Sequence, residues 1–291
     1  MYNVIESENG VLIKDIDYFS LRFTLDCGQA FRWNRISDDS YRGIVFSKLL
    51  SVTREGRDVF LENVTLDDYN GLFVDYFDLN FDYKSVILDY KDDEYINSGF
   101  KLAYGTRLLK QPHFETIISF IVSANNNVKR IKGIIERLAS NYGRKIADGA
   151  YSFPDRYELL KAGESDLEQL GLGYRASYVF ETCRMIDEGF DIENISDMDY
   201  LSAKKHLQSL KGVGPKVADC ILLYSYGFKR AFPIDVWIKR VLFNLYLKDK
   251  NISKKEICAF VNDYFGENAG ILQLFLFNYA RQFAAEGLTV K

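Results

Sequence analysis

The chain has 291 residues, which is more than one domain usually holds and predicts two. Its apolar content of 47% and mean hydropathy of −0.16 exclude an intrinsically disordered protein. No apolar run reaches the roughly 18 residues of a membrane span, and the acidic first ten residues lack the apolar stretch of a secretory signal. We therefore expect a soluble protein of the cytoplasm that does not contact a membrane. We also expect it to be a monomer.

The first part of the chain, to about residue 92, is predicted to be a β domain. Asn9-Gly10 is a strong hairpin signal between two short apolar runs, and similar runs follow it. The helical spacing of residues 66–79 predicts a helix on one face of the sheet. The predicted strands cover residues 4–5, 11–13, 19–25, 30–33, 41–45, 49–53 and 59–61.

From about residue 93 to residue 291 the apolar period is helical. The fold class is therefore α+β, with an antiparallel sheet domain (1–92) followed by an all-α domain (93–291). The last predicted helix is apolar almost all round, so we expect it to be buried. The predicted helices cover 93–104, 113–124, 127–141, 155–161, 166–170, 176–188, 199–209, 215–226, 234–247, 253–265 and 269–285.

The distribution of charge modifies what the net charge of −4 suggests about polyanions. Residues 51–100 hold 12 acidic and 4 basic side chains, whereas residues 101–150 hold 3 and 9 and residues 201–250 hold 3 and 10. The simplest interpretation of a single basic window is a helix face exposed to solvent. Because both basic windows also carry loop motifs, we expect them to form a polyanion-binding face.

The few cysteines and histidines limit metal chemistry. Cys27, Cys183, Cys220 and Cys258 lie far apart, and the chain has only 2 histidines. This spacing matches neither an iron–sulfur cluster nor a zinc site, so we expect free thiols, no cofactor and no metal held by side chains.

The segment LKGVGPKVAD, residues 210–219, predicts a helix–hairpin–helix with its hairpin at 210–216. Pro215 suits the first turn of a helix, and the segment lacks the spacing of a Walker loop or a dinucleotide fingerprint. Phosphate could approach the backbone N–H groups of Gly212, Val213 and Gly214 at the positive end of the following helix. The hairpin carbonyls could also hold a monovalent or divalent cation.

Two residues around this motif could carry chemistry. Lys216 is the second residue of the new helix and is either a surface lysine that contacts phosphate or an amine nucleophile. Asp235 follows Pro233 at a predicted helix start and is either an N-cap or a catalytic carboxylate.

The sequence LKGVGPKVADC, with PIDVW downstream, resembles the helix–hairpin–helix DNA glycosylases, and Lys216 resembles the lysine of their bifunctional members. Four further segments resemble, in the right order, signature blocks of the 8-oxoguanine DNA glycosylase family, in a compact bacterial form. They are CGQAFRW at 27–33, SANNNVKR at 123–130, LGLGYRASYV at 170–179 and LQLFLFNYAR at 272–281.

The resemblance implies an enzyme that flips 8-oxoguanine out of duplex DNA. Lys216 would attack the sugar C1′, expel the base and form a Schiff base that permits β-elimination, while Asp235 would orient the attack and stabilise positive charge. The Gly28 carbonyl would accept a hydrogen bond from the lesion's N7–H. Cys220 and Phe277 would pack against the two faces of the base, and Gln273 would read its Watson–Crick edge.

The resemblance also implies how the opposite strand is held. Asn125, Arg130 and Arg175 would hydrogen-bond the cytosine left behind, and the ring of Tyr174 would occupy the vacated stack. Trp237 departs from the family, many members of which have a phosphate-contacting histidine there.

The other function classes differ in features that can be read from the sequence. A degenerate helix–hairpin–helix module would grip DNA without catalysis, but the chain retains both Lys216 and Asp235. A relative that removes adenine or thymine glycol usually carries a four-cysteine cluster, and an alkylation-repair relative would have the aspartate without the lysine.

Overall fold

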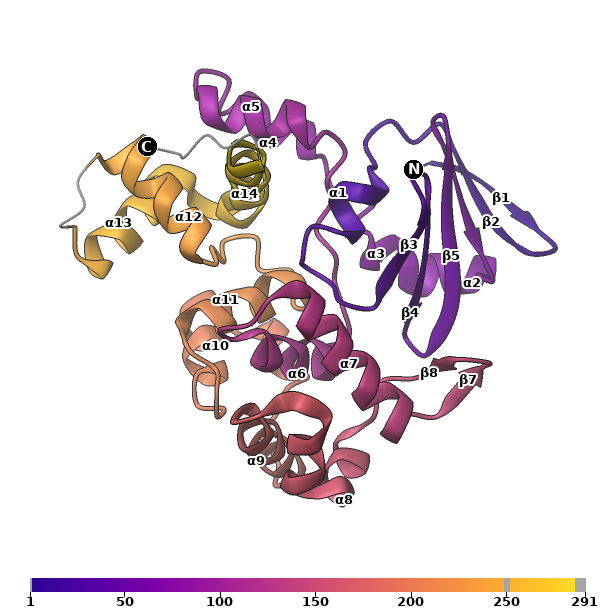
Figure 1. Cartoon of the computed structure of the whole chain (residues 1–291). Helices are drawn as coiled ribbons and strands as arrows, with labels where there is room; N and C mark the ends of the chain where they lie inside the picture. The colour runs from indigo at the N-terminus through magenta and orange to yellow at the C-terminus, as the bar shows by residue number, and fades with distance from the viewer. Residues whose placement is uncertain (1, 249–251, 286–291) are drawn as a thin grey trace.

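A computed structural model describes residues 2–248 and 252–285 of the chain. Figure 1 shows a sheet built by the N-terminal part, a group of helices from α6 to α11 below it, and the C-terminal helices α12 to α14 beside it. This arrangement confirms the predicted α+β fold class. No helix in the described ranges is long and apolar enough to cross a membrane.

The N-terminal sheet has six antiparallel strands in the order β1-β2-β6-β5-β4-β3. Asn9 and Gly10 lie at the β1–β2 turn, as the hairpin signal predicts, and Gly10 pairs with Ser7. The strands are β1 (Asn3–Ser7), β2 (Gly10–Lys14), β3 (Trp33–Ser37), β4 (Ser40–Val45), β5 (Lys48–Glu55) and β6 (Asp58–Glu62).

The predicted strand at 19–25 is wrong, because this segment forms the short helix α1 (Leu21–Leu25). Apolar residues at every second position gave it a strand-like pattern. The Ser20 hydroxyl accepts a hydrogen bond from Phe23 N–H and caps the helix, which turns Leu21, Thr24 and Leu25 into the protein. The predicted strand at 30–33 is also wrong, since only its last residue lies in a strand.

A short helical run, α2 (Leu66–Asp68), η1 (Tyr69–Phe73) and α3 (Val74–Tyr76), packs on the sheet as expected. The buried Trp33 indole donates to the Tyr76 hydroxyl across 2.7 Å within this contact. Helix α4 (Tyr83–Leu88) and the two-stranded pair β7 (Lys145–Ala147) and β8 (Ala150–Tyr151) are elements that the pattern did not predict.

The helical part follows the predicted order closely. Ten of its helices are α5 (Glu94–Leu102), α6 (His113–Ser123), α7 (Val128–Tyr142), α8 (Arg156–Leu167), α9 (Arg175–Asp187), α10 (Tyr200–Leu207), α11 (Pro215–Tyr224), α12 (Val236–Val241), α13 (Lys254–Phe265) and α14 (Ala269–Ala285). Shorter helical segments are η2 (Glu168–Leu172), η3 (Asn194–Asp197), η4 (Leu242–Leu247) and η5 (Gly266–Asn268).

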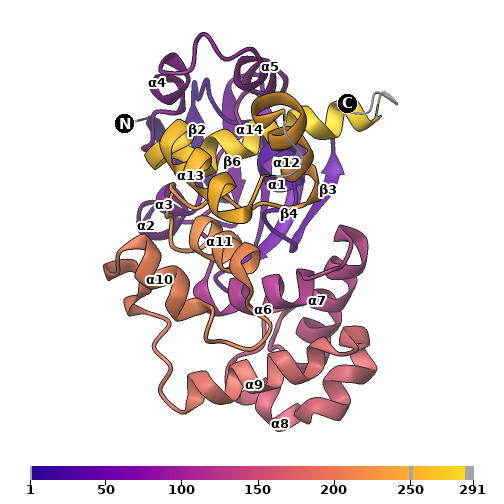
Figure 2. The same ribbon diagram turned by 90° about the vertical axis from the view of Figure 1, so that its left-hand side faces the viewer.

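Helix α14 packs inside the molecule, as its apolar sequence predicts. Ile271, Leu272, Phe275 and Leu276 are fully buried, and Figure 2 shows the helix running between α5 and α12. Two of its side chains, Gln273 and Asn278, are polar and nevertheless buried. Because a buried amide needs hydrogen-bond partners, each of these two side chains must lie beside specific polar groups.

Candidate active site

Six of the residues singled out in the sequence line one small pocket, with a cavity volume of about 70 Å³, between α11, α14 and the N-terminal domain. They come from four separate motifs, so only the fold brings them together. The six are Gly28, Lys216, Cys220, Asp235, Gln273 and Phe277, and the other lining residues are Cys27, Phe120, Tyr224, Pro233 and Leu274.

Helix α11 supplies Lys216 and, one turn later, Cys220. The Lys216 ammonium nitrogen lies 5.7 Å from the centre of the Phe120 ring, a cation–π arrangement that keeps the side chain at the pocket. Burial raises the pKa of the Cys220 thiol to about 11, although Lys216 acts in the opposite direction. Cys220 is therefore an uncharged thiol at neutral pH and suits contact with a flat apolar surface.

Asp235 is both an N-cap and a pocket residue, so its two predicted roles do not exclude each other. Its Oδ1 accepts a hydrogen bond from Ile238 N–H at 2.8 Å and caps α12, and its carboxylate lines the pocket with Lys216. The cap fixes the side chain, and Oδ2 is the oxygen not used by this bond.

Gln273 and Phe277 reach the pocket from successive turns of α14. The Gln273 amide nitrogen donates to the Pro233 carbonyl at 3.3 Å. Its Oε1 is buried and finds no hydrogen-bond partner within 2–248 and 252–285. An unsatisfied buried acceptor costs about 1–3 kcal/mol, which a ligand that donates to it would relieve.

Gly28 brings the N-terminal domain to the same pocket. Its φ of +96° lies in the region that favours glycine, so a side chain here would strain the backbone. The neighbouring Cys27 is buried, and burial raises the pKa of its thiol to about 11.

The hairpin lies between α10 and α11 as predicted. Gly212 has a φ of +77°, and a Cβ there would meet the Tyr178 ring at 2.7 Å, so glycine is required twice over. Gly214 is the N-cap residue of α11 and Pro215 is its first residue. Val213 is buried, whereas Gly214 is exposed at the helix N-terminus.

The residues predicted to face the opposite base form a second cluster, made by the loop after α6, the first turn of α7 and the start of α9. Tyr174 is 54% exposed, and the Arg130 guanidinium donates to the Gly171 carbonyl at 3.2 Å. Arg175 is 97% buried by contrast and donates to the Ala124 and Asn125 carbonyls, both at 2.9 Å. The two arginines therefore differ, since Arg130 lies at the surface and Arg175 holds the loop that carries Asn125.

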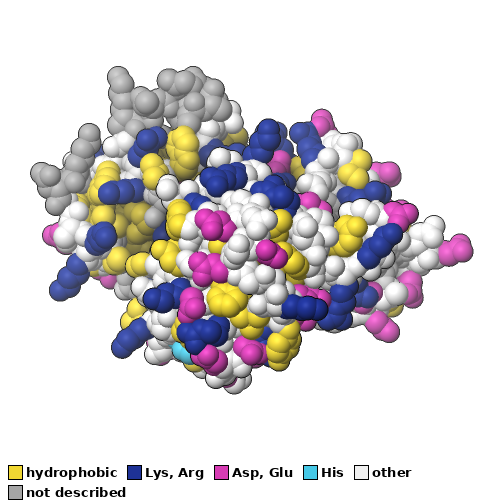
Figure 3. All heavy atoms as spheres, turned by 60° about the horizontal axis from the view of Figure 1, so that its bottom comes forward, with side chains coloured by type: hydrophobic (Ala, Val, Ile, Leu, Met, Phe, Trp, Pro, Cys, Tyr) yellow, Lys and Arg dark blue, Asp and Glu magenta, His cyan; other side chains and the backbone are white. Residues whose placement is uncertain are grey.

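Many side chains of the two basic windows are paired with carboxylates. Seven of their basic residues pair with carboxylates, and Figure 3 shows Lys and Arg side chains interspersed with Asp and Glu on one side of the molecule. Exposed Lys129, Arg130 and Lys211 lie instead at or beside the two loop motifs. The seven pairs are Lys110–Asp75, Lys132–Asp26, Arg144–Asp155, Lys145–Asp148, Lys204–Asp219, Lys229–Asp78 and Arg230–Glu267.

Sequence reasoning missed Phe120 and Tyr224 as pocket residues. A signal for Tyr224 was present, because it continues the four-residue spacing from Lys216 through Cys220 along α11. Phe120 lies within an apolar helix and differs in no visible way from core residues. No group of three or more His, Cys, Asp or Glu side chains that could hold a metal exists among the described residues.

Two family models and several known proteins match this chain. Residues 11–117 match the family "8-oxoguanine DNA glycosylase, N-terminal domain", and residues 118–265 match "HhH-GPD superfamily base excision DNA repair protein". A probable N-glycosylase/DNA lyase of Methanothermobacter thermautotrophicus is 36% identical over 229 residues, which cover 71% of this chain and 73% of the relative.

Solved structures show the same relationship. The Clostridium acetobutylicum 8-oxoguanine glycosylase/lyase, in complex with double-stranded DNA containing cytosine opposite 8-oxoguanine, has a TM-score of 0.93 and 34% identity over 97% of this chain and 99% of its own. The 3-methyladenine DNA glycosylase of Archaeoglobus fulgidus, with a TM-score of 0.74 and 20% identity over 97% and 99%, shares the fold. The chain therefore belongs to the 8-oxoguanine DNA glycosylase family within the HhH-GPD superfamily of base excision DNA repair proteins.

Proposed function

We propose that this protein removes 8-oxoguanine from duplex DNA and then cleaves the strand at the abasic site, with the lesion opposite cytosine as its preferred substrate. The observation that carries the proposal is that a lysine amine and a carboxylate line one pocket together with Gly28 and the unpaired amide oxygen of Gln273. A protein that only binds DNA would not need a lysine and a carboxylate in the same pocket.

In the proposed reaction the neutral amine of Lys216 attacks C1′ of the flipped nucleotide. The new C1′–N bond replaces the bond from C1′ to the base, which leaves with the bonding electrons and takes up a proton. Opening of the sugar gives an imine, and loss of a C2′ proton then expels the 3′ phosphate. Water hydrolyses the imine and returns the lysine.

Asp235 acts electrostatically in this scheme. Positive charge develops on the sugar as the base departs, and a carboxylate already fixed by its cap to Ile238 stabilises that charge without reorganising. It lines the same pocket as Lys216, which also suits orientation of the attacking amine.

Recognition of the lesion is assigned to the rest of the pocket. The Gly28 carbonyl would accept from N7–H, which 8-oxoguanine has and guanine lacks, while Gln273 Oε1 would accept from the Watson–Crick edge. Cys220 and Phe277 would hold the two faces of the ring. On the opposite strand, Asn125, Arg130 and Arg175 would hold cytosine and Tyr174 would fill the gap.

Three finer proposals accompany this function. We propose two domains, 1–92 and 93–291, which the sheet core supports because its buried apolar residues lie within 11–79 apart from Leu109. We propose that the hairpin at 210–216 binds DNA phosphate through its backbone N–H groups and a cation through its carbonyls. A comparison of DNA affinity in potassium and in magnesium salts tests this proposal.

We also propose that the protein acts in the bacterial cytoplasm, at the nucleoid.

The experiment that tests the proposed function is cleavage of four duplexes that carry 8-oxoguanine opposite each base. Base release and strand cleavage are followed separately, the former after alkaline treatment. We expect both products, formed fastest opposite cytosine. Binding of all four duplexes with no base release would identify a DNA-binding module instead.

A further inference from the structure

A buried glutamine next to Gly28 connects the pocket to the rest of the molecule. Gln29 is 1% exposed, and both ends of its amide are satisfied. Nε2 donates to the Thr24 and Arg107 carbonyls, each at 2.8 Å, and Oε1 accepts from Leu109 N–H at 3.0 Å. The bonds to Arg107 and Leu109 fix the residue after Gly28 against the segment that joins α5 to α6, and the bond to Thr24 ties it to α1.

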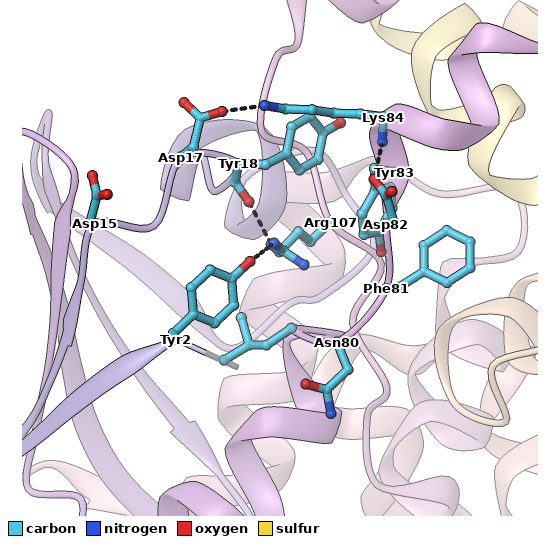
Figure 4. Close-up of a pocket in the computed structure, with 11 residues that line it drawn as sticks. Tyr2, Asp15, Asp17, Tyr18, Asn80, Phe81, Asp82, Tyr83, Lys84 and Arg107 are labelled. Atoms are coloured by element: carbon cyan, nitrogen blue, oxygen red, sulfur yellow. Dashed lines mark hydrogen bonds and ion pairs between the residues drawn. The ribbon is translucent and has the colours of Figure 1, made fainter.

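That segment is itself anchored to the N-terminal domain. The Arg107 side chain is 1% exposed and donates to the Tyr18 carbonyl at 2.7 Å, to the Asp78 carbonyl at 2.7 Å and to the Tyr2 hydroxyl at 2.9 Å. Figure 4 shows the guanidinium reaching toward Tyr2 and Tyr18. The backbone that Gln29 binds is therefore rigidly attached to the domain that carries Gly28.

The other end of the segment reaches α11, the helix that carries Lys216. Gln111 donates its backbone N–H to the Tyr224 carbonyl at 2.9 Å and its side-chain Nε2 to the Gln29 carbonyl at 2.6 Å. The Ser225 hydroxyl donates to the Gln111 carbonyl at 2.9 Å. A continuous set of hydrogen bonds thus runs from Gln29 through Gln111 to the end of the lysine helix.

We propose that Gln29 is a positioning residue that sets the distance between the Gly28 carbonyl and the Lys216 amine. Gln29 touches no substrate, because its amide is occupied on both sides by backbone groups. It holds the Gly28 loop of one domain against the lysine helix of the other, with Gln111 as the second link. This inference rests on the proposed function, in which Gly28 reads the base and Lys216 breaks its bond to the sugar.

The proposal separates two reactions of the same pocket. Excision of 8-oxoguanine needs the Gly28 carbonyl at the base and the amine at C1′ at once, so a shift of the loop slows it. Cleavage of an abasic site has no base to read and needs only Lys216. A purely structural role of Gln29 would lower both reactions together.

The test uses Gln29→Leu, which keeps the bulk of the side chain and removes its three hydrogen bonds, and Gln111→Leu, which cuts the second link. Single-turnover excision on an 8-oxoguanine:cytosine duplex is compared with cleavage of an abasic duplex. We expect Gln29→Leu to slow excision about tenfold to a hundredfold and to leave abasic cleavage within about twofold of wild type, as for a small misplacement at a reacting centre. Gln111→Leu should change the ratio in the same direction.

Val59→Ala provides the control, because it weakens the buried sheet core without touching the Gly28 loop. It should leave the ratio of the two reactions unchanged at a temperature where all variants are folded. Parallel loss of both reactions in Gln29→Leu and Gln111→Leu, or unchanged excision in both, would overturn the positioning role. A wild-type protein that cleaves abasic DNA but releases no 8-oxoguanine would instead contradict the proposed function.

Discussion

The side-chain amide of Gln273 donates a hydrogen bond to the backbone carbonyl of Pro233 across 3.3 Å. This bond joins α14 to the segment that leads into Asp235, and it uses only the nitrogen of the amide. The oxygen is left buried and unpaired among the described residues, at the wall of the pocket. An amide fixed at one atom and free at the other is ready to accept a hydrogen bond from a bound base.

Replacement of Gln273 by Ala tests this arrangement. We expect excision of 8-oxoguanine to fall about threefold to tenfold, the value of one hydrogen bond, with a smaller effect on abasic cleavage. Asn278→Ala removes a buried amide from the same helix, one that donates to the Leu274 carbonyl, and serves as the control. Equal losses of excision in the two variants would show that Gln273 acts through the packing of α14.

The two roles of Asp235 can be separated by two substitutions. Asn caps a helix as well as Asp does, so Asp235→Asn should keep the stability and DNA affinity of wild type. It should nevertheless slow base excision about a hundredfold to a thousandfold, because the charge that stabilises the transition state is gone. Asp235→Ala should lose the same activity and, in addition, about 1 kcal/mol of unfolding free energy. Unchanged excision in Asp235→Asn would remove the carboxylate from the mechanism.

The two arginines of the second cluster should respond differently to alanine. Arg130→Ala should reduce the preference for cytosine over adenine opposite the lesion by about tenfold to a hundredfold, with little change in stability, because the side chain is exposed. Arg175→Ala should lower the unfolding free energy by about 1–3 kcal/mol, since it leaves the carbonyl of the buried Leu172 and the partly buried carbonyls of the Asn125 loop without their donor. A wild-type enzyme indifferent to the opposite base would assign Arg130 to the phosphate backbone.

The carboxyl of Glu115 should make stability depend on pH. Burial raises its pKa from 4.5 to about 7, and the Arg32 guanidinium 4.0 Å away counters only part of this effect. The folded chain holds this proton more tightly than the unfolded chain, so the stabilisation is complete below pH 4.5 and is lost as the pH rises through 7.

Glu115→Gln imitates the protonated carboxyl and should not lose this stability. The difference in unfolding free energy between the variant and wild type should therefore grow from pH 4.5 to pH 7 and stay constant above it. Denaturant titrations across this range measure the difference, with the exposed Glu136→Gln as control. A flat difference curve for Glu115→Gln would place the carboxyl in contact with water.

The parts of the fold that repeat a local pattern could be predicted from the sequence. The helical period placed most helices within two residues of their observed bounds, and the spacing of Gly212, Gly214 and Pro215 fixed the hairpin. The segment 19–25 could not be predicted in this way, because its alternating apolar pattern fits a strand as well as a short helix. The Ser20 cap favours the helix, but the helix is preferred to a strand only in the folded protein, where its apolar side is buried.

The residues that line the site could be predicted from motifs, whereas the hydrogen bonds that connect them could not. The resemblance supplied six of the residues that line the pocket. The hydrogen bonds that hold the pocket together join Gln29 to Arg107 and Leu109, and Gln273 to Pro233, across 40 to 80 positions of the chain. No local pattern encodes such contacts. The charge windows likewise could not show which basic side chains are paired, because partners such as Asp75 of Lys110 and Asp78 of Lys229 are distant in sequence.

The central claim is that Lys216 becomes covalently attached to the DNA. Borohydride reduction of the reaction on an 8-oxoguanine:cytosine duplex, followed by peptide mapping of the adduct, measures this directly. The account predicts a trapped species on Lys216 in wild type and in Lys211→Gln, whose lysine is exposed on the hairpin, and none in Lys216→Gln. A trapped species of equal yield in Lys216→Gln, or its absence from wild type that still releases the base, would contradict the account.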